Sequence, residues 1–244
     1  MDHALYVAMT GAKQIMQAQA VNNHNMANVS TTGYRQDLHQ FSSFPIFGIG
    51  YPTRVNAVAT DAGTDLSSGT LSNTGRDLDV AVNGKGFIAV QGADGKEAYT
   101  RAGNLQVTAT GLLTTAGGFA VMSDGNPITL PPSTQISVGG DGTVSVVPLG
   151  LSPAAMSQVD RIKLVNPAEK DLVKGADGLF RLKSGAKAPT DTNVQITPGA
   201  LESSNVNMAA SLINMIELQR LYEMQIKGIS SIDQNAQSAE RLMQ

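Results

Sequence analysis

Residues 77–84 read Asp-Leu-Asp-Val-Ala-Val-Asn-Gly, and they mark the point at which the chain changes its periodicity. Apolar side chains alternate here with acidic or small ones, which is the period of two expected of a half-buried strand. The Asn83-Gly84 pair that follows is typical of the turn of a β-hairpin. We therefore expect a region of antiparallel strands to begin close to this stretch.

The same pattern continues as far as residue 197. Short apolar runs recur there, separated by Asp-Gly pairs at 94–95, 124–125, 141–142 and 177–178. Glycine in such a pair readily adopts the positive φ that a tight turn needs. Short strands with regularly spaced turns predict an antiparallel β domain over residues 74–197.

Both ends of the chain have a helical period instead. Residues 2–30 contain no proline and are rich in Ala, Met and Gln, and neither proline nor glycine occurs between Gly199 and Gly228. Apolar residues at intervals of three and four define one stripe on each segment. The predicted interface residues in these stripes are Leu5, Ala8, Ala12, Ile15, Met26 and Val29 in the first segment and Met208, Leu212, Met215, Tyr222, Ile226 and Ile229 in the last.

The predicted fold class is α+β: long N- and C-terminal helices form a coiled-coil-like layer, and a central antiparallel β domain is inserted between them. The predicted division is an N-terminal helix in residues 1–33, an extended connector in 34–73, the β domain in 74–197 and a C-terminal helix in 198–244. The two helices are expected to form an assembly layer.

The terminal helices have more apolar surface than one partner helix covers. The first carries only Asp2 and Lys13 as formal charges, and the last has further apolar residues on the faces beside its stripe. We therefore predict that copies of the chain pack side by side through these helices, because a contact that does not close into a ring generates a helical filament. The alternative is a monomer in which the two helices pair and cap the β domain.

Composition excludes several classes of function. The chain has 244 residues, no cysteine and a formal net charge of −3. Without cysteine there are no disulfides, thiolate zinc sites or cysteine nucleophiles. The slight acidity argues against nucleic acid as a partner. No apolar stretch is long enough for membrane insertion, and the N-terminus lacks the features of a cleavable signal peptide.

No catalytic pattern stands out among the polar residues. The three histidines have no spacing typical of a metal site. Asp77 and Asp79 share a face of the predicted strand, as an acid–base pair would, but ion pairing with Arg76 and Arg101 is the favoured interpretation. We therefore predict no enzyme activity, no catalytic residue, no metal and no cofactor.

Three groups of motifs resemble those of bacterial flagellar axial proteins, the rod and hook group. They run from Asn25 to Arg35, from Gly69 to Leu105 and from Gly199 to Glu223, and Thr32 stands where the family usually has proline. The motif residues on which the resemblance depends are Asn25, Asn28, Thr31, Gly33, Tyr34, Gly75, Arg76, Asp79, Asn83, Gly84, Gly86, Phe87, Asn205 and Gln219.

The resemblance implies a structural subunit of the flagellar basal-body rod. The opening residues and the modest length are most similar to the proximal rod protein, with the distal rod protein as the alternative. Family members leave the cell unfolded through the flagellar (type III) export apparatus, without a cleavable signal. They then assemble with copies of themselves and with other rod subunits into a hollow helical drive shaft, which transmits torque across the periplasm for motility.

Two further interpretations come from other functional classes. One is a periplasmic glycan-binding β module whose helices only dimerise, although aromatic residues for a sugar platform are few in residues 74–197. The other is a hydrolase of the periplasmic wall that depends on Asp77 or Asp79.

Overall fold

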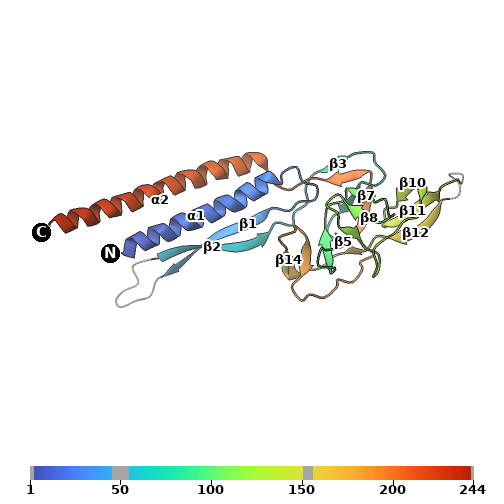
Figure 1. Ribbon diagram of the computed structural model, residues 1–244, viewed down its shortest axis with the longest axis horizontal. Helices are drawn as coiled ribbons and strands as arrows, with labels where there is room; N and C mark the ends of the chain where they lie inside the picture. The colour runs from blue at the N-terminus through green and yellow to red at the C-terminus, as the bar shows by residue number, and fades with distance from the viewer. Residues whose placement is uncertain (1–2, 46–54, 151–155, 243–244) are drawn as a thin grey trace. The chain divides into compact units, whose positions relative to one another are not determined.

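The computed structural model describes residues 3–45, 55–150 and 156–242 (Figure 1). The chain forms two compact units. The helical unit combines residues 1–29, 36–65 and 206–244, and the β unit combines residues 30–35 and 66–205. The polypeptide therefore passes from one unit to the other at four places along its sequence, after residues 29, 35, 65 and 205.

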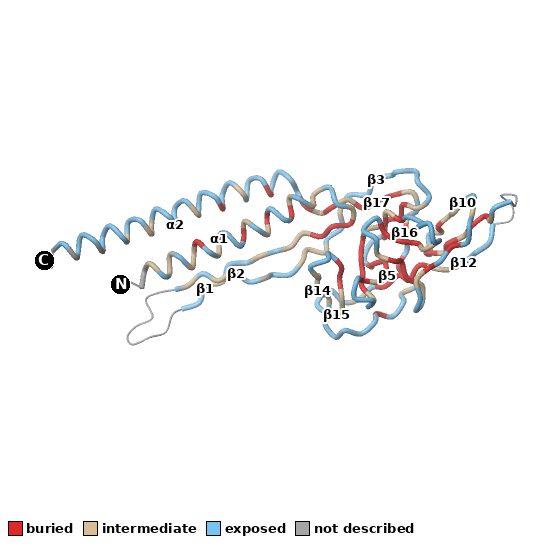
Figure 2. The backbone as a smooth tube through the Cα atoms, viewed as in Figure 1, coloured by how far each residue is buried: buried red, intermediate tan, exposed pale blue. Residues whose placement is uncertain are grey.

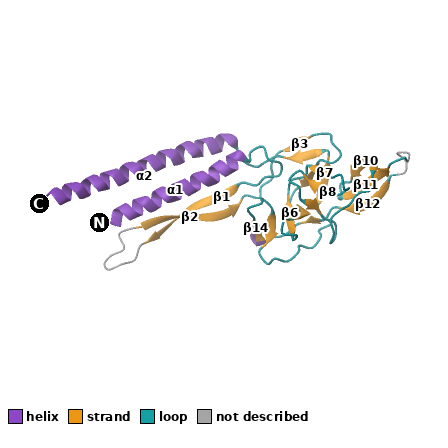
Figure 3. Cartoon of the chain, in the orientation of Figure 1, coloured by secondary structure: helices purple, strands orange, loops and turns teal. Residues whose placement is uncertain are grey.

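The helical unit contains two helices and a β-hairpin. Helices α1 (His3–Ala27) and α2 (Met208–Leu242) run antiparallel beside each other (Figure 1). Strands β1 (Asp37–Pro45) and β2 (Val55–Thr64) pair antiparallel and pack along α1 (Figure 3). A bulge between Leu38 and His39 shifts their register.

Asparagine side chains satisfy backbone groups at the ends of both helices. Oδ1 of Asn207 accepts the N–H of Ala210 at 3.1 Å, so Asn207 caps the start of α2. At the end of α1, Nδ2 of Asn28 donates to the carbonyl oxygen of His24 at 2.9 Å. These bonds pair groups that a helix terminus otherwise leaves unpaired.

The predicted α+β fold class, with its coiled-coil-like layer of long helices, is wrong. The described residues are mostly β, with a large antiparallel domain and one flanking helix at each end. The physical reason lies partly in α1, which packs against both α2 and the β1–β2 hairpin and so is not part of a layer made of helices alone. The predicted boundaries at residues 33, 73 and 197 stay a prediction.

The β unit is built of short strands and one 3₁₀ turn, η2 (Glu169–Asp171). Its strands are β3 (Leu71–Asn73), β4 (Val80–Asn83), β5 (Phe87–Gln91), β6 (Glu97–Thr100), β7 (Leu105–Val107), β8 (Leu113–Thr115), β9 (Ala120–Val121), β10 (Ser133–Val138), β11 (Thr143–Pro148), β12 (Ser157–Arg161), β13 (Leu164–Val165), β14 (Leu172–Lys174), β15 (Phe180–Leu182), β16 (Gln195–Pro198) and β17 (Ala200–Glu202).

These strands form one large sheet and three small ones. The eight-stranded sheet has the order β14-β15-β6-β5-β9-β8-β7, with β13 paired to β5. β10, β11 and β12 form a three-stranded sheet. The remaining pairs, β16–β4 and β17–β3, join the two ends of the β unit's sequence.

One apolar cluster joins the large sheet to the three-stranded sheet. Ile88 and Val90 of β5 and Val144 and Val146 of β11 all belong to it and are fully buried (Figure 2). Burying a side chain of this size stabilises a fold by about 1.5–3 kcal/mol. The core of the chain therefore lies in the β unit.

Three hairpins of the β unit close with the same loop. The loops read Gly-Ala-Asp-Gly-Lys (92–96), Gly-Gly-Asp-Gly-Thr (139–143) and Gly-Ala-Asp-Gly-Leu (175–179). In each, the first glycine N–H donates to the carbonyl of the fifth residue at 2.8 Å, and the aspartate Oδ1 accepts the fifth N–H at 3.2 Å. In each loop the glycine that follows the aspartate takes a positive φ of 72–88°. The expected Asp-Gly turns thus owe their shape to glycine φ and an aspartate acceptor.

Candidate assembly surface and motif network

The inner face of α1 is used within the chain. Ile15 and Ala18 pack with Leu218 of α2, and Tyr222 lies against this cluster. Ala12 is buried on the same face. The other predicted interface residues of the first segment are half-buried: Leu5, Ala8 and Met26 in α1, and Val29, which follows the end of the helix at Ala27.

The face of α2 that packs against α1 is offset from the predicted stripe: every second position of the stripe is shifted by one residue along the sequence. The positions of α2 described as buried or half-buried share Met215, Tyr222 and Ile229 with that stripe. The others are Ser211, Leu218, Gln225, Gly228 and Ile232. Leu212 and Ile226 are therefore left 40% and 45% exposed, and Met208 is exposed as well. Ser211 is buried instead, and its carbonyl oxygen accepts a hydrogen bond from Asn22 of α1.

A set of large apolar side chains remains exposed on the two helices. We call this set the outer helix surface. It consists of Tyr6, Met9 and Met16 of α1 and Met208, Leu212, Ile213, Ile216, Leu221, Met224 and Ile226 of α2. Exposed apolar groups in such number mark an interaction site or a liability to aggregate. Figure 2 shows how little of α2 is buried.

Asn25 of the first motif connects α1 to the hairpin. Its side chain is buried, and it forms two hydrogen bonds with the backbone of Asp37. Asn22, one turn earlier and also buried, donates to the carbonyl oxygen of Ser211 at 2.9 Å. Polar side chains therefore stand at the inner face of α1, where they join helix to strand and helix to helix.

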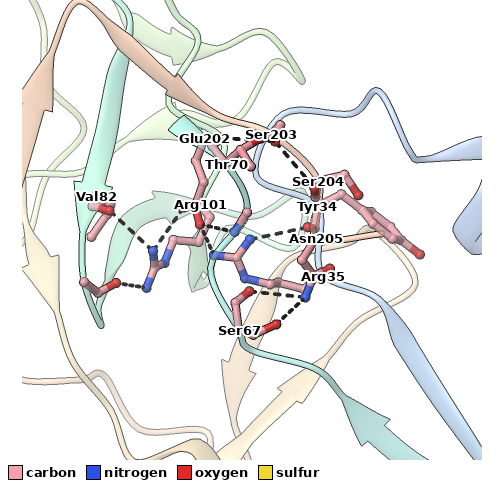
Figure 4. A network of polar contacts seen from close by, with 12 residues as sticks. Tyr34, Arg35, Ser67, Thr70, Val82, Arg101, Glu202, Ser203, Ser204 and Asn205 are labelled. Atoms are coloured by element: carbon pink, nitrogen blue, oxygen red, sulfur yellow. Dashed lines mark hydrogen bonds and ion pairs between the residues drawn. The ribbon is translucent and has the colours of Figure 1, made fainter. Parts of the chain in front are cut away.

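Glu202 of β17 lies at the centre of a buried ionic network in the β unit (Figure 4). Nη2 of Arg35 donates to its Oε1 at 2.6 Å, and Nη1 of Arg101 donates to its Oε2 at 3.0 Å. The side chains of Arg35 and Glu202 are 0% and 1% exposed. Burial lowers the pKa of Arg101, and the charge of Glu202 opposes that shift.

Predicted motif residues surround these charges. The Gly33 N–H donates to the backbone carbonyl of Glu202 at 2.8 Å, and the carbonyl of Gly84 accepts from Nη2 of Arg101 at 2.6 Å. The Arg101 guanidinium lies 5.2 Å from the ring centroid of Phe87. The two other motif residues that reach this network are Tyr34, whose carbonyl accepts from Arg35 and from the N–H of Asn205, and Asn205 itself, whose Nδ2 donates to Ser67.

Asp79 organises the turn that precedes β4. Its carboxylate accepts from Thr74 at 2.8 Å and pairs with Arg76 at 3.4 Å, while Asp77 is exposed. The expected pairing with Arg76 is therefore present, whereas Arg101, expected beside it, pairs with Glu202 instead. Of the remaining motif residues, Gly86 is buried with φ of 135°, Asn28 is half-buried, and Thr31, Gly75, Asn83 and Gln219 are exposed.

Sequence reasoning missed the roles of Arg35, Arg101 and Glu202, although all three stand in or beside the motifs. A signal was available, because charged residues make up only 15% of the chain and all three of these lie within the motif segments. Within the described ranges, no group of three or more His, Asp or Glu side chains is arranged to hold a metal ion. Neither of the two described helices is apolar over a length that would cross a bilayer.

Two family descriptions match the chain. "Flagellar hook protein FlgE/F/G D1 domain" matches residues 81–146, which lie in the β unit. "Flagellar basal body rod FlgEFG protein C-terminal" matches residues 197–242, which include β17 and α2. The first match covers the Arg101 end of the network, and the second covers Glu202.

Relatives align over nearly the whole chain. The flagellar basal-body rod protein FlgF of Escherichia coli K12 is 40% identical over 249 residues, which cover 100% of this chain and 99% of that protein. FlgF of Salmonella typhimurium LT2 is 41% identical with the same coverage. The flagellar basal-body rod protein FlgG of Buchnera aphidicola from Acyrthosiphon pisum is 32% identical over 98% of this chain and 99% of its own length.

These matches confirm the family that the motifs predicted, its location in the flagellar basal body and its role as a structural rod component. The chain belongs to the family of flagellar hook and basal-body rod proteins that comprises FlgE, FlgF and FlgG.

Proposed function

We propose that this rod subunit takes its place in the proximal rod and packs against copies of itself and against other rod subunits through the outer helix surface. The observation that carries the proposal is the apolar area left on α1 and α2 after the two helices have paired. The FlgF proteins of Escherichia coli and Salmonella typhimurium, at 40% and 41% identity, are more similar to this chain than FlgG of Buchnera aphidicola at 32%, and this supports the proximal position.

The predicted interface residues divide into two groups under this proposal. Ala12, Ile15 and Tyr222 hold α1 to α2 within one copy. Leu212 and Ile226 are available to a neighbour, and full burial of each is worth about 1.5–3 kcal/mol relative to exposure. In an assembly of many copies, contacts between helices would therefore supply the free energy that stabilises the filament.

The proposal extends to how the subunit works and how it arrives. Repetition of one contact that does not close yields a hollow helical shaft, and close-packed side chains in it resist shear as the motor turns. Passage through the flagellar export apparatus as an unfolded chain accords with the lack of cysteine, since no disulfide has to be avoided or re-formed. The role is structural, with no catalytic step.

A charge placed on the outer helix surface tests the proposal. Ile226→Glu in α2 is compared with Val173→Glu in β14, since the two side chains have similar exposure at 45% and 48%. Ile226→Glu is expected to remove the protein from purified basal bodies and to abolish swimming, because a carboxylate buried in an apolar contact is strongly unfavourable. Val173→Glu is expected to leave both unchanged.

The unfolding transition of each purified variant provides the control for stability. Both substitutions lie at exposed positions, so both transitions are expected within about 0.5 kcal/mol of the unaltered chain. Incorporation of the Ile226→Glu variant into basal bodies, with normal swimming, would contradict the assignment of Ile226 to the interface.

A further inference from the structure

Glu202 has more positive charge beside it than charge balance requires. One arginine neutralises one carboxylate, yet Arg35 and Arg101 both bind it, and all three side chains are at most 3% exposed. The Nε atoms of both arginines are buried without a hydrogen-bond partner among the described residues. Burying a second like charge is unfavourable in a low-dielectric interior, so the second arginine needs a reason other than neutralisation.

The two arginines are attached to different parts of the β unit. Arg101 follows β6, and its guanidinium also donates to the backbone carbonyls of Val82 and Gly84 in and after β4. Arg35 is the last residue of the segment 30–35, which lies between α1 and β1 in the sequence but belongs to the β unit. Glu202 accepts from both with separate oxygens, so its carboxylate bridges this segment to the strands (Figure 4).

The bridge holds a second crossing segment as well. The N–H of Gly69 donates to Oε1 of Glu202 at 2.9 Å, and a Cβ at Gly69 would lie 2.0 Å from the backbone oxygen of Ser203. Ser203 in turn donates its N–H to the carbonyl of Thr70 at 2.9 Å. The segments that begin at residues 30 and 66 and the one that ends at 205 are therefore all bonded at or next to one carboxylate.

We propose that Glu202 is a clamp at the points where the chain passes between its two units. Arg35 fixes the segment 30–35 to its carboxylate, the Gly69 N–H fixes the segment 66–70 to the same carboxylate, and Arg101 ties that carboxylate to the strands of the β unit. The role is positional and is separate from the stability of the β core. In the proposed function, the clamp is a rigid connection through which force on the polypeptide reaches the strands. The clamp itself exists within a single copy and needs no assembly.

Amide hydrogen exchange of the purified full chain tests the clamp without any assembly. The variant is Arg35→Met, which leaves Arg101 and Glu202 as a balanced pair. The control is Arg181→Met, which removes a guanidinium that also pairs with a carboxylate of the β unit, that of Asp177, but is 28% exposed. Since the Gly33 N–H reports on the clamp and the N–H groups of β5 and β6 report on the core, both are followed in each variant.

We expect Arg35→Met to speed exchange at Gly33 by at least about tenfold while β5 and β6 stay within about twofold of the unaltered chain. Arg181→Met is expected to leave Gly33 unchanged. Arg101→Met, which removes the other arm of the bridge, is expected to speed Gly33 as well.

Three results would overturn the proposal. Unchanged exchange at Gly33 in Arg35→Met would show that backbone bonds alone hold the segment. Equal acceleration of β5 and β6, or failure of the variant to fold, would show that Arg35 supports the whole domain and is no clamp. Because no partner takes part, each result is independent of whether the subunit assembles through its helices.

Discussion

The side-chain amide of Asn25 pairs with both backbone groups of Asp37, as a neighbouring strand residue would. Nδ2 donates to the carbonyl oxygen at 2.8 Å, and Oδ1 accepts the N–H at 2.9 Å. Asn25 is 2% exposed, so neither bond is exchanged readily for water. The amide thus fixes where β1 begins relative to α1.

Replacing this amide by a carboxylate keeps the shape and removes the donor. Asn25→Asp is expected to destabilise the helical unit by about 1–3 kcal/mol, because the Asp37 carbonyl is left unpaired beside a buried charge. Asn23→Asp, at an exposed position of the same helix, is the matched control and is expected to have little effect. Exchange protection of the Asp37 amide measures the difference, and equal protection in both variants would contradict the role of Asn25.

Substitutions at Gly33 and Gly75 distinguish the cost of backbone strain from the cost of a steric clash. Their φ values are 68° and 69°, but a Cβ at Gly33 would lie 2.3 Å from the carbonyl carbon of Arg101, whereas a Cβ at Gly75 meets nothing within 4 Å. Gly75→Ala is expected to cost about 1–2 kcal/mol from backbone strain alone. Gly33→Ala adds a collision with backbone and is expected to cost clearly more in urea unfolding. Similar costs at both sites would show that the loop at Gly33 moves aside freely.

Tyr99 gives the β unit a dependence on alkaline pH. Burial raises the pKa of Tyr99 to about 12 from its ordinary value of 10.0, and the Glu97 carboxylate adds to that shift. A raised folded-state pKa contributes stability that is complete below the unfolded value and is lost as pH rises through the folded one. The free energy of unfolding should therefore fall between about pH 10 and pH 12. In Tyr99→Phe this part of the fall should be absent, and an unchanged slope would refute the assignment.

Arg181 joins two of the three Gly-x-Asp-Gly loops. Its guanidinium donates to Asp177 at 2.7 and 3.0 Å and lies 3.5 Å from Asp94. Hydrogen bonds from Arg181 lower the pKa of Asp177 from its ordinary value of 3.8. The stability this contributes is present above the unfolded value and is lost as pH falls through the folded one. Arg181→Met should raise the pKa of Asp177 in a nuclear magnetic resonance titration and reduce the loss of stability at acid pH. An unmoved pKa would show that Arg181 does not cause the lowered pKa of Asp177.

Local patterns were the features that the sequence made predictable. The alternation in residues 77–84 and the Asp-Gly pairs need only neighbouring residues to take effect, and β4 and three of the expected Asp-Gly loops lie there. The hairpin turn expected at Asn83-Gly84 is wrong, because β4 pairs with β16 and not with β5. The hairpin of β1 and β2 was harder to foresee, because its apolar residues, such as Phe41 and Phe44, lie on both faces and do not alternate. That hairpin, packed on α1, is one reason why the predicted fold class failed.

The ionic network and the face of α2 that packs against α1 depend on residues that are distant in sequence. Two overlapping stripes on α2 are offset by one position, and the one that contains Ser211 and Leu218 is in contact with α1. Arg35 and Glu202 are 167 residues apart, so no local pattern connects them. The motifs did indicate which segments matter, since Gly33, Gly84 and Phe87 surround the arginines.

The sequence separation of Arg35 and Glu202 sets an order for folding. The three Gly-x-Asp-Gly hairpins close between near neighbours, which takes about 1–10 μs. Glu202 belongs to the last fifth of the chain, and its contacts require closure over 101 and 167 residues. Contacts of such span form slowly, because the loop must be closed before they gain anything. Before residue 202 is in place, Arg35 and Arg101 lack the carboxylate that they bind in the folded chain. The β unit therefore reaches its final form only when nearly all of the polypeptide is present.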